Sequence, residues 1–167
     1  MCNNLIPQKI GIFIWRALLR RIPVRVELNK RGIDLASLRC PVCDDDIETV
    51  DHILLNCSFA KDIWDRLYRW WNMGNLMHTN LEDLFKGINK ATSSSSSKLW
   101  QAVVWICGYL IWQNKNSTIF RNYKGNGPVL LNEIQIKAYE WISKRSNKFK
   151  LDWNQWLINP SSFDDHG

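Results

Sequence analysis

Residues 40–57 read CPVCDDDIETVDHILLNC and hold three of the chain's five cysteines together with one of its three histidines. Two cysteines separated by two residues can direct both sulfur atoms to one point, and a histidine and a third cysteine follow after a short loop. These four residues are Cys40, Cys43, His52 and Cys57. Three thiolates and an imidazole are among the ligand sets that enclose structural zinc, so we predict one structural Zn²⁺ here.

Other interpretations of this stretch are possible. Free cysteines are often small core residues, and a C-x-x-C pair can carry out redox chemistry, although the strand-rich surroundings of a thioredoxin-like site are missing. The aspartates at 44–46 could suggest carboxylates for Mg²⁺, but adjacent residues on a tight loop point apart. Because protein atoms fill all four zinc positions, we expect the metal to hold the fold and to do no chemistry.

Glu48 precedes His52 by four residues, a spacing that places both on one side of a helical turn. We predict that Glu48 accepts the hydrogen bond from the imidazole N–H that the metal leaves free. The alternative is an exposed acid at the N-terminal end of a helix.

The composition predicts one globular domain or two small helical lobes. The chain has 167 residues, 46% of them hydrophobic, and ten tryptophans that supply a large apolar area. An odd number of cysteines, two of them isolated, argues against a disulfide framework and favours a reducing compartment. The apolar segment 99–112 is too short for a bilayer, which needs about 20 residues. We therefore expect an intracellular protein of the nucleus or cytoplasm with no membrane partner.

Apolar periodicity and helix-end signals predict a mostly α protein with little or no sheet. The expected helices cover residues 8–21, 23–32, 59–71, 81–88, 97–122 and 128–147. Residues 73–97 contain turn-rich and serine-rich stretches, so we predict a hinge there. We expect a small zinc-stapled helical lobe over 1–72, followed by a C-terminal helical segment over 98–167.

The formal net charge of +6 is unevenly distributed, because acidic residues outnumber basic ones in 40–72 while basic residues dominate on both sides. Basic residues interleaved with aromatic ones suit phosphate contact and base stacking, although exposed arginines are usually only solvated. The candidate nucleic-acid contacts are Lys9, Arg16, Arg20, Arg21, Arg25, Lys30, Arg31 and Arg39.

Read as C-x2-C-x4-E-x3-H-x4-C-x6-W, residues 40–64 resemble the zinc-binding domain at the C-terminal end of plant LINE-type (non-LTR) retrotransposon reverse transcriptases. Residues 6–33, IPQKIGIFIWRALLRRIPVRVELNKRGI, resemble the lead-in of that family. Residues 111–122 and 141–160 resemble its later segments, although Asn114 and Asn116 stand where the family more often has an Arg-Asn pair.

The resemblance implies that the same four Cys and His residues bind the metal and that Trp15 and Trp64 belong to the core around it. It also implies a parent polypeptide with endonuclease and polymerase regions. We expect this chain to be a truncated or domesticated C-terminal part of such a protein.

The sequence lacks a Y-x-D-D polymerase signature, a glycine-rich phosphate loop and a nucleophile beside a base. We therefore expect no enzymatic activity and no small-molecule substrate. The favoured function is a zinc-binding module that binds RNA or target DNA through its basic residues. The alternative, favoured by the apolar first helix, is a structural or protein-interaction module that docks on the polymerase body or on another protein.

Overall fold

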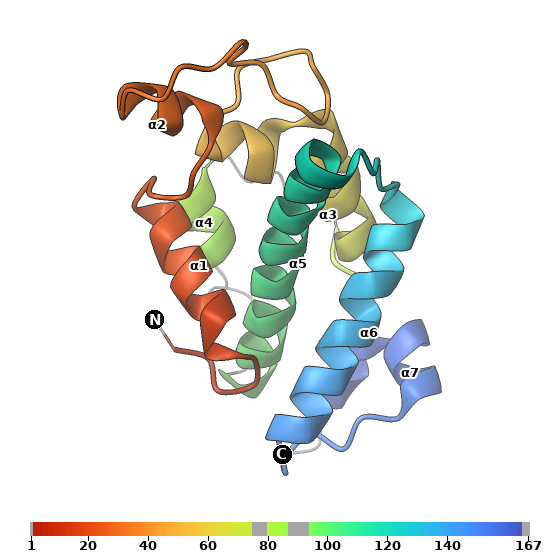
Figure 1. Ribbon diagram of the computed structural model, residues 1–167. Helices are drawn as coiled ribbons and strands as arrows, with labels where there is room; N and C mark the ends of the chain where they lie inside the picture. Colours follow the sequence, from red (N-terminus) through yellow and green to blue (C-terminus); the bar gives the residue numbers. More distant parts are fainter. Residues whose placement is uncertain (1, 75–79, 87–93, 165–167) are drawn as a thin grey trace.

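The computed structural model describes residues 2–74, 80–86 and 94–164, and the named elements in this part of the chain are all helical (Figure 1). Strand-like pairing within it is limited to one isolated antiparallel bridge between Arg39 and Ile47. The predicted mostly α fold without a sheet is therefore confirmed.

The elements along the chain are α1 (Gln8–Leu18), α2 (Arg25–Lys30), the π-helical turn η1 (His52–Asn56), α3 (Ser58–Trp70), α4 (Leu81–Lys86), α5 (Ser94–Arg121), α6 (Gly127–Arg145), α7 (Trp153–Ile158) and the 3₁₀ turn η3 (Pro160–Asp164). The longest described connection between elements is the loop between α2 and η1, and it carries Cys40 and Cys43.

Several predicted helix boundaries differ from those of the structure, and the two largest differences are three residues each. The first helix ends at Leu18 rather than at residue 21, because Arg20 takes a left-handed backbone conformation with a φ of 56°. The helix α5 begins at Ser94, three residues earlier than predicted, so part of the serine run continues the helix.

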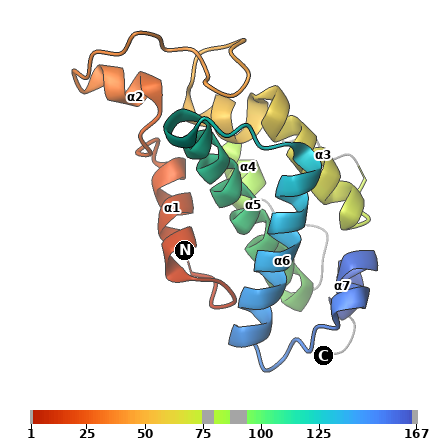
Figure 2. The same cartoon turned by 45° about the vertical axis from the view of Figure 1, so that its right-hand side comes forward.

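The helix α5 lies at the centre of the fold, between α1 and α6, in both ribbon views (Figures 1 and 2). It packs against α1, α4, η1 and α6. Its residues Ala102–Ile106 are all buried. A helix that is apolar around its circumference needs neighbours on every side, and the other helices supply them. No helix in the described ranges, α5 included, is long and apolar enough to cross a membrane.

Four tryptophans connect the predicted N-terminal lobe to the predicted C-terminal segment. Trp71 of the predicted lobe lies 5.0 Å from Trp100 and 5.8 Å from Trp156, measured between ring centroids. Trp70 lies 5.1 Å from Trp156. The Trp156 indole N–H also donates a hydrogen bond of 3.0 Å to the carbonyl of Gln135 in α6. Residues of 1–72 and of 98–167 therefore share one hydrophobic cluster.

The predicted hinge, 73–97, contains a described helix. Leu81, Leu84 and Phe85 of α4 are buried in the same hydrophobic cluster, and Trp105 of α5 donates its indole hydrogen bond of 3.2 Å to the carbonyl of Phe85. Residues 75–79 and 87–93 of the predicted hinge lie outside the described residues. The division of the chain at 72 and 98 stays a prediction.

The two tryptophans assigned to the core by family resemblance differ in position. Trp64 is buried and donates a hydrogen bond of 2.9 Å to the carbonyl of Leu54. Trp15 is 50% exposed, so its assignment to the core was wrong. The inward face of α1 is formed by Ile10, Phe13, Ile14 and Ala17, and the position of Trp15 on the helix places it outside that face.

Replacing Trp156 by alanine should lower the free energy of unfolding by about 3–5 kcal/mol, because a fully buried indole leaves a cavity among its neighbours. Trp15→Ala is the matched control, since half of that side chain is already exposed to water. Denaturant unfolding followed by circular dichroism measures both changes. Equal losses in the two variants would contradict the positions described for these side chains.

Candidate metal centre

The first two candidate ligands lie on a tight loop that the bridge between Arg39 and Ile47 closes. The Cys40 N–H donates a hydrogen bond of 2.7 Å to the Asp46 carbonyl, and the Asp44 N–H donates one of 2.9 Å to the Cys40 carbonyl. Asp44 has a left-handed φ of 60°, which reverses the chain direction. The Asp45 N–H points to Cys43 Sγ at 3.5 Å. The loop thus presents both sulfur atoms on one side, as the C-x-x-C spacing predicts.

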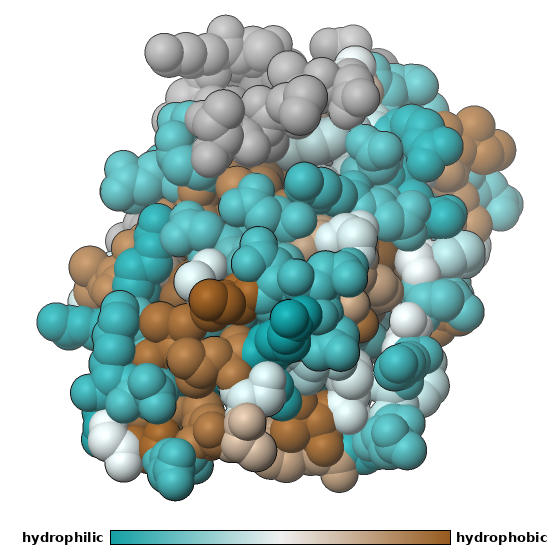
Figure 3. All heavy atoms as spheres, turned by 90° about the horizontal axis from the view of Figure 1, so that it is seen from above, coloured by the Kyte–Doolittle hydropathy of each residue, from teal (hydrophilic) through white to brown (hydrophobic). Residues whose placement is uncertain are grey.

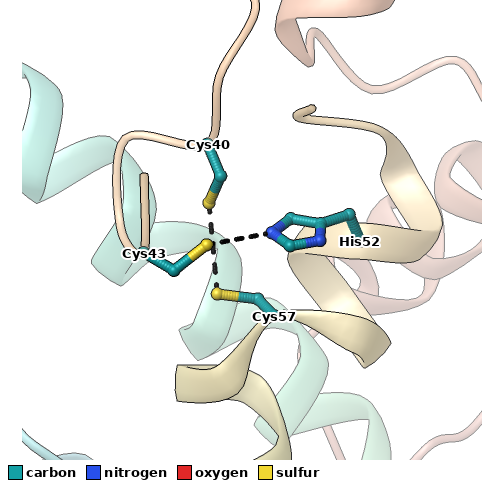
Figure 4. Close-up of side chains that lie close together, drawn as sticks. All are labelled: Cys40, Cys43, His52 and Cys57. Carbon is teal, nitrogen blue, oxygen red and sulfur yellow. Dashed lines mark hydrogen bonds between the residues drawn. The ribbon is translucent and has the colours of Figure 1, made fainter. Parts of the chain in front are cut away.

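The second pair of candidate ligands lies at the two ends of one helical turn. The His52 N–H donates to Thr49 Oγ1 at 3.0 Å, and the Cys57 N–H donates to the His52 carbonyl at 2.7 Å. Cys57 immediately precedes α3. Figure 4 shows this turn presenting the imidazole and the Cys57 sulfur toward the loop that carries Cys40 and Cys43.

The four donor atoms lie within 4.8 Å of one another. The Cys40 and Cys57 sulfur atoms are 4.0 Å apart, and Cys43 Sγ is 3.3 Å from His52 Nε2. Typical Zn–S and Zn–N bond lengths give tetrahedral edges of about 3.8 Å between two sulfur atoms and about 3.6 Å between sulfur and nitrogen. These two distances are close to the edges of such a tetrahedron, and the four residues are positioned to bind one zinc ion.

Burial and local hydrogen bonds shape the acidity of the two buried sulfur atoms. The hydrogen bond between Cys40 and Cys57, helped by burial, raises the pKa of the Cys40 thiol. The same hydrogen bond lowers the pKa of Cys57, and the N–H groups of Phe59 and Ala60 in the first turn of α3 lower it further against the effect of burial. The start of α3 thus favours a thiolate at Cys57, which is the form of cysteine that binds metals.

The contacts of Glu48 differ from the predicted hydrogen bond to His52. Its carboxylate is 0% exposed and lies with Oε1 2.8 Å from Lys115 Nζ and with Oε2 3.5 Å from Arg25 Nε. The prediction assumed a helix from Glu48 to His52, but the helical conformation begins only at Val50. The acid beside the imidazole is Asp46, whose Oδ2 lies 3.8 Å from His52 Nδ1.

Sequence reasoning missed Lys115, which lies near the end of α5 and is buried. Besides its ion pair with Glu48, its ammonium group lies 3.4 Å from the Pro23 carbonyl and 4.2 Å from the centroid of the Trp112 ring. Burial lowers the pKa of Lys115, and the Glu48 carboxylate opposes that shift. The one signal for this contact in the sequence was the position of the lysine, which follows the strongly apolar segment 99–112 within the same helix.

The structure divides the eight candidate nucleic-acid contacts into two groups. Arg20, Arg25 and Lys30 already pair with carboxylates, at 2.9 Å from Asp51, 3.5 Å from Glu48 and 2.8 Å from Glu27 respectively. The other five are exposed, and in the part of the chain that the structure describes none of them has a carboxylate within ion-pair distance. These five are Lys9, Arg16, Arg21, Arg31 and Arg39.

One comparison with protein families gave a match that includes the metal centre. A family model described as zinc-binding in reverse transcriptase matches residues 1–64, the range that contains all four donors. Searches of curated proteins and of solved structures gave no significant match. The match agrees with the coarser part of the resemblance seen in the sequence. The LINE type and the plant origin stay predictions.

Replacing Cys43 by serine should reduce the zinc content from one ion per chain to well below one, because the site then keeps only three of its four donors. Cys2→Ser is the matched control, since Cys2 is an exposed cysteine outside the cluster. Elemental analysis of the purified proteins measures the zinc content. Unchanged zinc in Cys43→Ser would rule out this ligand assignment.

Replacing Lys115 by alanine should destabilise the fold by about 3–5 kcal/mol, because it removes the closest partner of a buried carboxylate. The double variant Glu48→Met/Lys115→Met should be much less destabilised, since both charges are replaced by apolar side chains of similar volume. Denaturant titration of the single and double variants gives the comparison. A larger loss in the double variant than in Lys115→Ala would contradict this account of the pair.

Proposed function

We propose that the chain is a non-catalytic zinc-binding module from the C-terminal part of a retrotransposon reverse transcriptase of the plant LINE type, and that it binds RNA or DNA beside the metal centre. The observation that carries this proposal is the closed set of four protein donors within 4.8 Å of one another. A zinc ion with four protein ligands keeps no position for water or substrate, which suits a structural role. The match to the reverse-transcriptase zinc-binding family supports the same assignment.

The role of the metal in this proposal is to join two segments that have little regular structure of their own. Cys40 and Cys43 would hold the loop, while His52 and Cys57 would hold the turn before α3. Zinc bound by such sites contributes apparent binding free energies of about 10–16 kcal/mol in small finger peptides. That energy would stabilise the arrangement of the loop against the helical part of the protein.

We place nucleic-acid contact on the end of α1 and on α2 rather than on the metal loop itself. The loop carries the exposed aspartates 44–46, which repel phosphates. Arg21 follows α1 and Arg31 follows α2, and both side chains are exposed. The end of α1, the helix α2 and the metal loop lie at the same end of the molecule (Figure 1). Contact of this kind is tolerant of sequence and sensitive to salt.

The double variant Arg21→Glu/Arg31→Glu should bind short single-stranded RNA more weakly, and its salt dependence should be shallower. Loss of two phosphate contacts reduces the slope of log K against log salt by about 1.4 for a single strand. Fluorescence anisotropy at several salt concentrations, with RNA and with duplex DNA, measures both quantities.

The matched control is Lys144→Glu/Arg145→Glu, which changes the net charge equally at the end of α6 far from the metal loop (Figure 1). Both control residues are exposed. An equal loss of affinity in the two double variants would show that only net charge matters. Absence of salt-dependent binding by the unaltered protein would overturn the nucleic-acid part of the proposal.

A further inference from the structure

A groove of about 620 Å³ lies between α1, α2 and the C-terminal end of α5. Lys9, Ile12 and Arg16 line it from α1, and Trp112, Lys115 and Ile119 line it from α5. On each helix these residues follow a spacing of three and four, so each helix presents one face to the groove. The groove is therefore a channel with two helical walls, and Arg25 and Leu28 of α2 also line it.

The surface of this channel is largely apolar, and part of it is open to water. Phe13 and Trp112 are buried within it. Ile12 is 49% exposed, Ile119 is 39% exposed and Phe120, at the end of the same wall, is 80% exposed. Figure 3 shows apolar side chains gathered at the lower left of that view, bordered by hydrophilic residues. Large exposed apolar side chains grouped in one concave surface are typical of a binding site.

The charged side chains around the groove are all basic. Lys9, Arg16, Arg25 and Lys115 line it, and no aspartate or glutamate is among its lining residues in the described part of the chain. Glu48 lies beneath and neutralises Arg25 and Lys115 in part. Lys9 and Arg16 have no carboxylate within ion-pair distance among the described residues. The groove thus offers an apolar surface with two available positive charges on its α1 side.

This chemistry favours a protein segment over nucleic acid. Bases bind by stacking on exposed aromatic faces, and Phe120 is the one exposed aromatic side chain among the described lining residues. Aliphatic residues such as Ile12, Leu28, Leu35 and Ile119 provide most of the remaining apolar lining. Such side chains interdigitate with leucine or isoleucine from an amphipathic helix. The described residues form no sheet edge here, so an extended peptide would find no strand to pair with.

We propose that this groove binds an amphipathic helical segment of a partner protein, with large apolar side chains on one face and carboxylates beside them. The apolar face would lie against Ile12, Ile119 and Phe120. The carboxylates would pair with Lys9 and Arg16. The inference goes beyond nucleic-acid binding and does not depend on it, because Arg21 and Arg31 do not line the groove.

A designed peptide tests the proposal. The probe is a fluorescent helix of about four turns with leucine at helical spacing and glutamate on its flanks. A peptide of the same composition in scrambled order is the first control, and a peptide with lysine in place of glutamate is the second. We expect the ordered glutamate peptide to bind best. Failure of that peptide to bind, or equal binding of the scrambled peptide, would overturn the proposal.

Variants of the protein locate the binding. Phe120→Asp should weaken binding of the glutamate peptide by about tenfold or more, as loss of a large apolar contact at an interface does. Ile158→Asp is the matched control, because Ile158 is 79% exposed on α7 and does not line the groove. Lys9→Glu/Arg16→Glu should weaken the glutamate peptide and strengthen the lysine peptide. Circular dichroism of each variant checks that these surface changes leave the fold intact.

Three results would overturn the assignment of this groove to a helical segment of a partner protein. Equal loss in Phe120→Asp and Ile158→Asp would show that the peptide binds elsewhere. Competition by single-stranded RNA that is lost in Phe120→Asp would assign the groove to nucleic acid. Dimerisation of the protein alone, abolished by Phe120→Asp in sedimentation experiments, would assign it to a second copy of the chain.

Discussion

The convergence of three sulfur atoms and one imidazole nitrogen within 4.8 Å is the constraint on which the N-terminal part of the protein depends. The loop that carries Cys40 and Cys43 is held by one isolated bridge, a few turn hydrogen bonds and side-chain hydrogen bonds from Arg25 and Arg39 to loop carbonyls. Local interactions of that kind contribute little, because each intramolecular hydrogen bond stabilises a fold by only about 1 kcal/mol net. Four ligands to one ion would supply the remaining constraint.

The position of the metal loop also affects other parts of the protein, because Glu48 follows that loop directly in the sequence. The Glu48 carbonyl accepts a hydrogen bond of 3.3 Å from the N–H of Val26 in α2, and its carboxylate pairs with Arg25 of α2 and Lys115 of α5. A buried ion pair is costly to desolvate and contributes little net stability unless its geometry is good. We interpret its role here as one of position, since it connects α2 and α5 to the metal loop. Arg25 and Lys115 also line the apolar groove, so the same contacts shape that surface.

The basic residues of the N-terminal part have different surroundings in the structure. Arg20, Arg25 and Lys30 neutralise nearby acids, Lys9 and Arg16 border an apolar groove, and Arg21 and Arg31 face solvent. The net charge of a segment therefore does not identify a nucleic-acid interface by itself. Pairing and surroundings decide which cations remain available for an acidic partner.

The sequence alone identified the four residues that are positioned to bind zinc, and it determined the helical class of the fold. Ligand spacing and helical periodicity are local properties, since covalent geometry and hydrogen bonds between near neighbours set them. Only the tertiary structure decided that Trp15 faces solvent while Trp64 is buried, because indole is compatible with either position. It also decided that Glu48 pairs with Lys115 rather than His52. That contact joins residues far apart in the chain, and only the packing of α5 against the metal loop brings them together.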